Sequence, residues 1–163
     1  MMNMEIRTRC MDELMNIRCD ERLSRMKAFG QHGETDTYEH CCNVAAMALK
    51  IAFVFRLKEY KIRNAIVGAM LHDFYLYDYH GARRTVRGFH AFVHPEIALE
   101  NACAIFDLND RQKNVIRSHM FPATLFHVPK YAEAWVVNLS DKYCAVREFV
   151  AYRLHKKRWE ASA

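Results

Sequence analysis

The 163-residue sequence has few residues that break regular structure, with only five glycines and three prolines. Average proteins contain roughly 12% of these two residues together. Their scarcity favours long helices and argues against a sandwich or barrel of short strands, which needs many turns. A run of about 20 apolar residues, as a membrane helix requires, is also lacking. The longest apolar stretch, residues 44–55, is short and carries Lys50.

The first fifteen residues carry charges and lack the apolar centre of a secretion signal. None of the six cysteines forms a CxxC pair, so we expect reduced thiols in a cytoplasmic protein without a membrane partner. The net charge of +5 is too small to indicate a dedicated nucleic-acid binder. Length and an apolar content of 52% predict one domain over residues 1–163, and they leave a homodimer open.

Hydrophobic spacing predicts an all-α fold, a compact bundle of about six or more helices. Residues 35–37 offer N-cap side chains, Pro95 suits the first turn of a helix, and Asn109 suits a cap. Residues 78–92 are expected to form a loop or an irregular insert. The expected helices cover residues 12–29, 38–57, 60–73, 95–106, 110–120 and 132–157.

Several of the nine histidines lie on apolar helix faces, where a buried polar group without a partner destabilises the fold. His40 shares a helix face with apolar residues at 44, 47 and 51, and Asp141 has apolar neighbours one turn away on the last helix. His72 and Asp73 end a helix that is apolar just before them. A buried carboxylate without a partner is expensive. One divalent cation would satisfy all four residues, and imidazole and carboxylate donors suit Mn, Fe, Co, Ni or Zn.

Two further histidines could serve a second ion. His94 precedes Pro95, which disfavours helical geometry and places His94 at a helix start, and His119 ends the next predicted helix. Each residue also has a simpler interpretation. His40 could be a satisfied core histidine, His94 a cap, and His119 a cation favoured at a helix C-terminus. Asp141 could pair with a cation. The candidates for that pairing are Arg147 and Lys142.

The order His40, His72–Asp73, Asp141 resembles the H…HD…D pattern of the HD-domain metal-dependent phosphohydrolase superfamily, whose fold is all-helical. The segments TYEHCCNVAAMALKIA, AIVGAMLHDF and LSDKYCAVREF are similar to its ligand-bearing helices, and HPEIALENA and IRSHM to the extra-histidine segments of two-metal members. The resemblance implies four ligands for a first metal and a bridging role for Asp73. It also implies that His94 and His119 bind a second metal.

The activity that the resemblance implies is hydrolysis of a phosphate ester or anhydride, often of a nucleotide, by water activated on one or two ions of Fe, Mn, Co, Ni, Zn or Mg. Here the pair is followed by FYLY, so Leu76 stands where the HDxxED motif of alarmone hydrolases has Glu. The GYP element of cyclic-dinucleotide phosphodiesterases is also missing. Members that cleave dinucleoside polyphosphates keep the six-ligand pattern and remain a plausible analogy.

The catalytic candidates are His72, Asp73 and, as a proton donor or a water-positioning group, Asp78. Positive groups that would bind a phosphorylated substrate are Arg83, Arg84, Arg87, His90 and Lys142, although this insert can equally be a solvated loop. The alternative to an enzyme is a non-catalytic HD-fold module that binds a nucleotide or a partner. A weaker alternative is nucleic-acid binding through the basic end of the last helix, residues 153–158.

Overall fold

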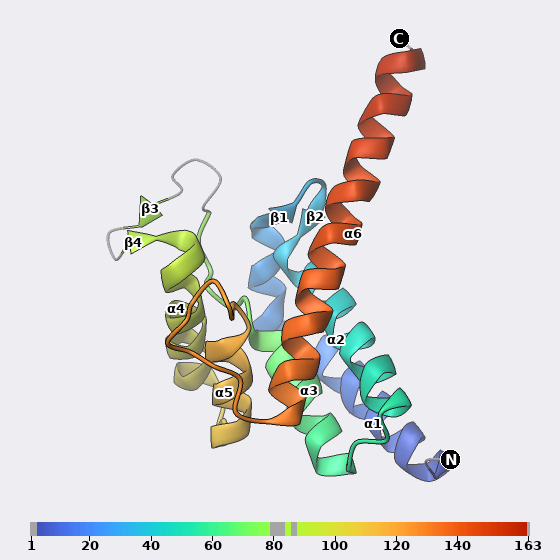
Figure 1. The fold of residues 1–163 in the computed structure, drawn as a ribbon, viewed down its shortest axis with the longest axis vertical. Coiled ribbons are helices and arrows are strands. Elements are labelled where there is room, and N and C mark those ends of the chain that lie inside the picture. Colours follow the sequence, from blue (N-terminus) through green and yellow to red (C-terminus); the bar gives the residue numbers. More distant parts are fainter. Residues whose placement is uncertain (1–2, 79–83, 86–87, 163) are drawn as a thin grey trace.

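The computed structural model describes residues 3–78, 84–85 and 88–162, and these form a mostly helical bundle, which confirms the predicted fold class (Figure 1). Two short antiparallel hairpins, β1–β2 and β3–β4, accompany the helices. The elements are α1 (Met4–Arg18), the 3-10 helix η1 (Glu21–Ala28), β1 (Gly30–His32), β2 (Thr35–Asp36), α2 (Thr37–Val54), α3 (Glu59–Leu71), β3 (Arg84–Thr85), β4 (Gly88–Phe89), α4 (His90–Ile105), α5 (Asp110–Ser118) and α6 (Ala132–Ser162).

The core lies where α2 and α3 pack against each other and against α6. Its members are aliphatic and fully buried, with Val44 from α2, Ile62 and Ile66 from α3 and Val137 from α6 among them. The helices α4 and α5 pack side by side and close one flank, where α5 meets α3 (Figure 1). Helix α6 runs along the whole bundle, and its C-terminal turns extend beyond the other helices (Figure 1).

Helices α3 and α5 approach closely at Gly68. A Cβ atom added there would collide with the side chain of Val115, so only glycine permits this crossing. The approach matters because His72 follows the end of α3 and His119 follows the end of α5. The predicted caps are confirmed: Asp36 accepts a hydrogen bond from the Glu39 amide at 2.7 Å, and Asn109 forms a capping box at α5.

The single predicted helix over residues 12–29 is wrong. Helix α1 starts earlier, at Met4, and ends at Arg18; a separate 3-10 helix follows because the Asp20 side chain accepts from the Arg22 amide and caps a new start. Helix α6 continues to Ser162, five residues beyond its predicted end.

The predicted start of the fourth helix is also wrong. Helix α4 begins at His90, directly after the β4 strand, so Pro95 lies inside the helix. His94 is therefore helical, although the following proline disfavours that geometry. The cost is limited because the proline falls in the second turn, where it removes one main-chain donor. The shift brings His94 and His90 onto the same helix face, one turn apart.

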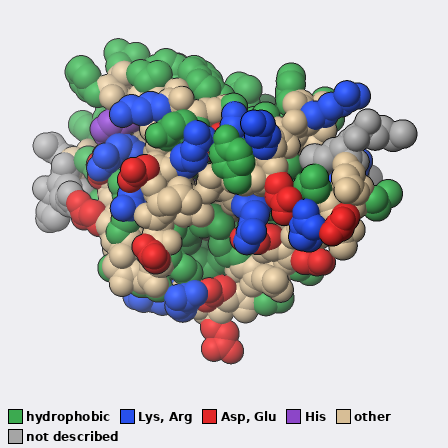
Figure 2. Space-filling model, turned by 90° about the horizontal axis from the view of Figure 1, so that it is seen from below, with side chains coloured by type: hydrophobic (Ala, Val, Ile, Leu, Met, Phe, Trp, Pro, Cys, Tyr) green, Lys and Arg blue, Asp and Glu red, His purple; other side chains and the backbone are tan. Residues whose placement is uncertain are grey.

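No helix in the described part of the chain is long and apolar enough to cross a membrane. All six cysteines are free thiols, as expected. Viewed from below, the molecule shows basic and acidic side chains interspersed over much of its surface, and hydrophobic side chains gathered along one edge (Figure 2).

Candidate metal centre

Three elements of the bundle bring one set of ligand atoms together, which we call the first group: His40 on α2, His72 after α3 and Asp141 on α6. Asp141 Oδ1 lies 3.1 Å from His40 Nε2 and 3.7 Å from His72 Nε2. All three residues are buried. The sequence prediction that these side chains converge from separate helices is therefore met by the geometry.

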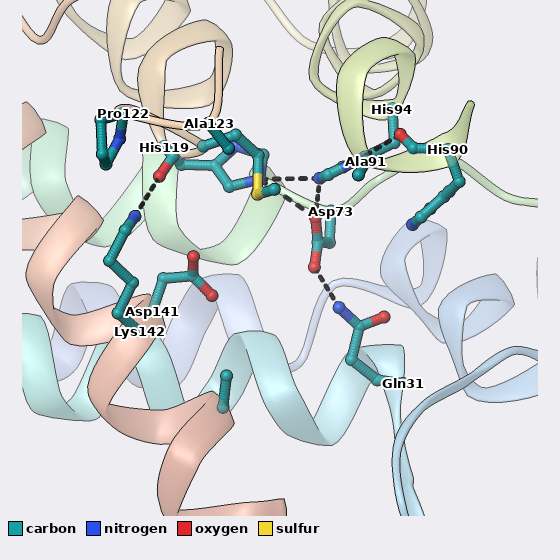
Figure 3. Close-up of a pocket in the computed structure, with 12 residues that line it drawn as sticks. Gln31, Asp73, His90, Ala91, His94, His119, Pro122, Ala123, Asp141 and Lys142 are labelled. Carbon is teal, nitrogen blue, oxygen red and sulfur yellow. Dashed lines mark hydrogen bonds and ion pairs between the residues drawn. The ribbon is translucent and has the colours of Figure 1, made fainter. Parts of the chain in front are cut away.

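A second set lies beside the first, and we call it the second group: Asp73, His94 and His119 (Figure 3). Asp73 Oδ1 is 3.2 Å from His94 Nε2 and 3.4 Å from His119 Nε2, and the two Nε2 atoms are 2.9 Å apart. The other oxygen of Asp73, Oδ2, lies 3.4 Å from His72 Nε2. Asp73 thus stands between the two groups.

The main chain fixes the orientation of three of these rings. In His72, His94 and His119 the Nδ1 atom faces a carbonyl oxygen three or four residues earlier, so Nδ1 must donate to it and Nε2 is the nitrogen that faces the cluster. Such hydrogen bonds are typical of metal-bound histidines, because they set the tautomer that leaves Nε2 available. The acceptors are the carbonyl oxygens of Ala69, His90 and Ile116, at 2.7, 2.9 and 2.7 Å respectively.

A side chain orients the fourth ring. His40 Nδ1 lies 2.8 Å from Oε2 of Glu148, and Glu148 Oε1 accepts from Asn43 Nδ2 at 2.9 Å. Glu148 is buried on α6, two turns after Asp141. Sequence reasoning missed this residue, although its spacing of seven from Asp141 puts both carboxylates on one helix face.

These orientations point the Nε2 atoms at one another and at carboxylate oxygens. The Nε2 atoms of His94 and His119 face each other at 2.9 Å, and His40 Nε2 faces Asp141 Oδ1 at 3.1 Å. Among buried polar atoms, His72 Nε2 and Asp73 Oδ1 have no hydrogen-bond partner. A divalent cation would satisfy these two unpartnered atoms, and nitrogen and carboxylate donors suit a divalent transition metal. The two groups therefore fit the residues of a metal centre.

Burial and neighbouring charges shift the pKa values of the ligands in both groups. Burial lowers the pKa of His40, but hydrogen bonds with Asp141 and Glu148 outweigh burial and raise that pKa to about 9. Burial and the neighbouring charge of His72 lower the pKa of His119 to about 3, so its ring is neutral. Burial alone would raise the pKa of Asp73, yet the charge of His72 brings it well below its usual range. Asp73 is therefore ionised, as a ligand must be.

A buried network connects Asp73 to the first hairpin. The Gln31 side chain donates from Nε2 to Asp73 Oδ2 at 2.5 Å, and its Oε1 accepts from the Tyr75 hydroxyl at 2.5 Å. The Tyr75 hydroxyl also lies 3.1 Å from Oγ1 of Thr37. Gln31 was not predicted, since nothing in the spacing of a residue between Gly30 and Gly33 indicates that a hairpin folds back onto the cluster.

Helix α6 holds the segment that carries His119. Asn138 Nδ2 donates to the carbonyl oxygen of His119 at 2.6 Å, and Lys142 Nζ donates to the same oxygen at 2.9 Å. Lys142 therefore does not pair with Asp141, which faces the two histidines of the first group. Arg147 lines a different pocket. The ion-pair interpretation of Asp141 is wrong for both cations because the helix directs them away from it.

A pocket of about 640 Å³ opens over the second group (Figure 3). Of the predicted substrate contacts, His90 and Lys142 line it. His90 stacks on His94 with ring centroids 4.5 Å apart, and its Nδ1 lies 2.8 Å from the Tyr77 hydroxyl. The described lining residues are Gln31, Asp73, His90, Ala91, His94, His119, Met120, Pro122, Ala123, Asp141, Lys142 and Ala145.

The remaining predicted residues fall elsewhere. Asp78 is exposed and is not among the described residues that line the pocket. Arg84 lies in β3, while Arg83 and Arg87 lie outside the described residues. The basic residues 153 and 155–157 are exposed near the C-terminal end of α6.

Comparisons with known proteins return no match: no protein-family model, no curated protein and no solved structure is significantly similar to this chain.

Proposed function

We propose that the chain is a metal-dependent phosphohydrolase that cleaves a phosphate ester or anhydride of a small substrate such as a nucleotide. One observation carries the proposal: histidine Nε2 atoms and carboxylate oxygens from separate helices face one another at 2.9–3.4 Å in the second group. The resemblance to the HD-domain superfamily supplies the reaction class. It rests on His40, the His72–Asp73 pair and Asp141, with His94 and His119 as the extra histidines of two-metal members.

His40, His72 and Asp141 would hold one ion, and Asp73, His94 and His119 a second one. The imidazole-rich donor set favours Mn, Fe, Co, Ni or Zn over Mg, which prefers oxygen. A divalent ion bound there would supply a water molecule whose pKa is lowered from about 15.7 towards 7.

The chain's own residues position the substrate. A lysine ammonium has three hydrogens. Lys142 directs two of its hydrogens to the carbonyl oxygens of His119 and Asn138, at 2.9 and 3.4 Å. The third can reach a phosphoryl oxygen in the pocket, where the positive charge offsets the negative charge that the phosphoryl oxygens carry in the transition state. His90 on the opposite wall offers a further contact. Small apolar side chains, Ala91 and Ala123 among them, leave room for the rest of the substrate.

The test compares three proteins purified without chelator or affinity-tag histidines: wild type, Asp73→Asn, and Asp107→Asn as an exposed control. Elemental analysis is expected to find about two transition-metal ions per wild-type chain and a loss in Asp73→Asn. Hydrolysis of a nucleotide panel is expected to fall about a thousandfold in Asp73→Asn, because the water loses its activating ion. Asp107→Asn is expected to match wild type in both readouts.

A wild-type protein that holds no metal, even after Mn or Zn is added, would contradict the proposal. Nucleotide binding without metal or turnover would instead favour the non-catalytic binding module. Metal without turnover on any phosphorylated compound would leave a metal-binding protein of another reaction class.

A further inference from the structure

Six large apolar side chains stand exposed in a row on α6. Between 41% and 64% of each is accessible to solvent. Single exposed apolar residues are ordinary, but a continuous row over about five helical turns marks an interaction surface. The six residues, which we call the α6 row, are Trp135, Leu139, Tyr143, Val146, Val150 and Leu154.

The spacing of the α6 row repeats every 11 residues. Three of the exposed positions are each followed by another after 11 residues. The pairs are 135 and 146, 139 and 150, and 143 and 154. An 11-residue period corresponds to 3.67 residues per turn, so a nearly straight helix keeps all six positions on one side. The buried residues of α6, Val137 and Cys144 for example, project from the other side into the bundle.

We propose that the α6 row is the interface of a homodimer in which the α6 helices of two copies pack antiparallel. Among the described helices, only α6 has an exposed apolar face of this length. The α6 helix of a second copy therefore provides an apolar surface of equal length. A two-fold axis between residues 143 and 146 places each bulky residue against a smaller one. The facing pairs are Trp135 with Leu154, Leu139 with Val150, and Tyr143 with Val146.

Charge favours the antiparallel direction. Arg153, Lys156 and Lys157 lie on the last turns of α6. In a parallel pair the two basic ends would lie side by side and repel each other. With the axis between residues 143 and 146, residue 155 of one copy lies beside residue 134 of the other. The antiparallel pair therefore separates the two basic ends by about 21 residues, about 32 Å at 1.5 Å per residue. Parallel packing would also oppose Trp135 to its own copy and leave gaps at the valines.

The available area is sufficient for a weak to moderate dimer. Half-exposed side chains of this size contribute roughly 100 Å² apiece. Two copies of the α6 row then bury about 1,200 Å², the lower end of the range for specific interfaces. Phe149, which is also exposed on α6, adds to this area.

The first test is the oligomeric state of the full chain by sedimentation equilibrium. Wild type is expected to be dimeric at ~50 µM, and Val146→Glu monomeric, with the dissociation constant raised about a hundredfold because a charge is buried near the axis. The matched control is Val54→Glu, the same change at an exposed valine at the end of α2, which is expected to stay dimeric. Circular dichroism melting confirms that each variant is folded.

Mixing two variants tests the direction of the pair. Leu139→Lys and Val150→Glu are each expected to be monomeric, whereas an equimolar mixture is expected to form a heterodimer, because residue 139 of one copy faces residue 150 of the other only in the antiparallel arrangement. A folded wild type that stays monomeric at ~500 µM would overturn the proposal, as would a Val146→Glu variant that remains dimeric. A dimer without recovery in the mixture would overturn the antiparallel pairing.

Discussion

The two groups of buried ligands are held in place by different means. In the first group the Glu148 side chain orients His40 and only His72 is held by a main-chain carbonyl, and α2, α3 and α6 form the centre of the bundle. In the second group main-chain carbonyls orient both histidines, and their carriers α4 and α5 form the flank beside the pocket.

The groups also differ in what can satisfy them without a metal. The pKa of His40 is raised to about 9, so a proton can lie between His40 and Asp141. The pKa of His119 is lowered to about 3, so its ring stays neutral and offers no proton towards His94. The comparison indicates that a proton can join His40 to Asp141 in the first group, whereas in the second group His119 supplies no proton to its 2.9 Å contact with His94.

Replacing one ligand in each group would test whether they are separate sites, and we expect this change to have the largest effect. His40→Ala is expected to weaken binding in the first group, and His94→Ala in the second, by at least about a hundredfold each. Each variant would then retain about one ion per chain. Elemental analysis after dialysis against metal-free buffer measures this, with exposed His155→Ala as the control. Loss of all metal in both variants would show that the six residues form one indivisible centre.

Removing the side-chain support of the first group should have the next largest effect. Glu148→Gln removes the charge that fixes the His40 ring, and loss of such a partner typically weakens metal affinity about 10–100-fold. Competition with a chelating dye would detect the loss in one of two binding steps. Glu39→Gln, at an exposed glutamate on the same helix as His40, is the matched control. An equal loss in both binding steps would contradict the separate support of the two groups.

The sequence predicts those site residues that would destabilise the fold if they were buried without a partner. His40 and Asp141 stand out because a charged or polar group on an apolar helix face needs a partner. His72 and Asp73 stand out at the end of an apolar helix. Helical periodicity then brings these residues to one place, because long helices with few breakers can only pack as a bundle.

What the sequence does not predict depends on short segments and tertiary geometry. The predicted start of α4 rests on the preference of proline for the first turn of a helix. In the structure, the strand pairing that precedes α4 ends at Phe89, and the helix begins directly after it. Glu148 was overlooked because a glutamate near the exposed end of a long helix has many ordinary interpretations. Gln31 lies outside any helix, so helical spacing cannot indicate its position. A hairpin of seven residues, Gly30–Asp36, turns at Gly33 and brings Gln31 to Asp73.

The network of Gln31 and Tyr75 gives the smallest expected effects, and it tests how Asp73 is oriented between the two groups. The Gln31 amide donates to Asp73 Oδ2, the oxygen on the first-group side, and leaves Oδ1 to the second group. Gln31→Ala is expected to weaken metal binding about tenfold, because Asp73 keeps its other contacts but loses the donor that orients it. Gln31→Glu should be worse than alanine, since a second carboxylate beside Asp73 repels it.

Which of the two Gln31 variants weakens metal binding more shows whether Gln31 acts through its hydrogen bond or only by filling space. If Gln31 only fills space, glutamate, which has nearly the same shape, would behave like wild type and alanine would be the more damaging change. Tyr75→Phe removes one hydroxyl at the far end of the same network and is expected to have a smaller effect than either variant. Calorimetric titration with Mn measures all three affinities, and a glutamate variant that binds as tightly as wild type would exclude Gln31 as the residue that orients Asp73.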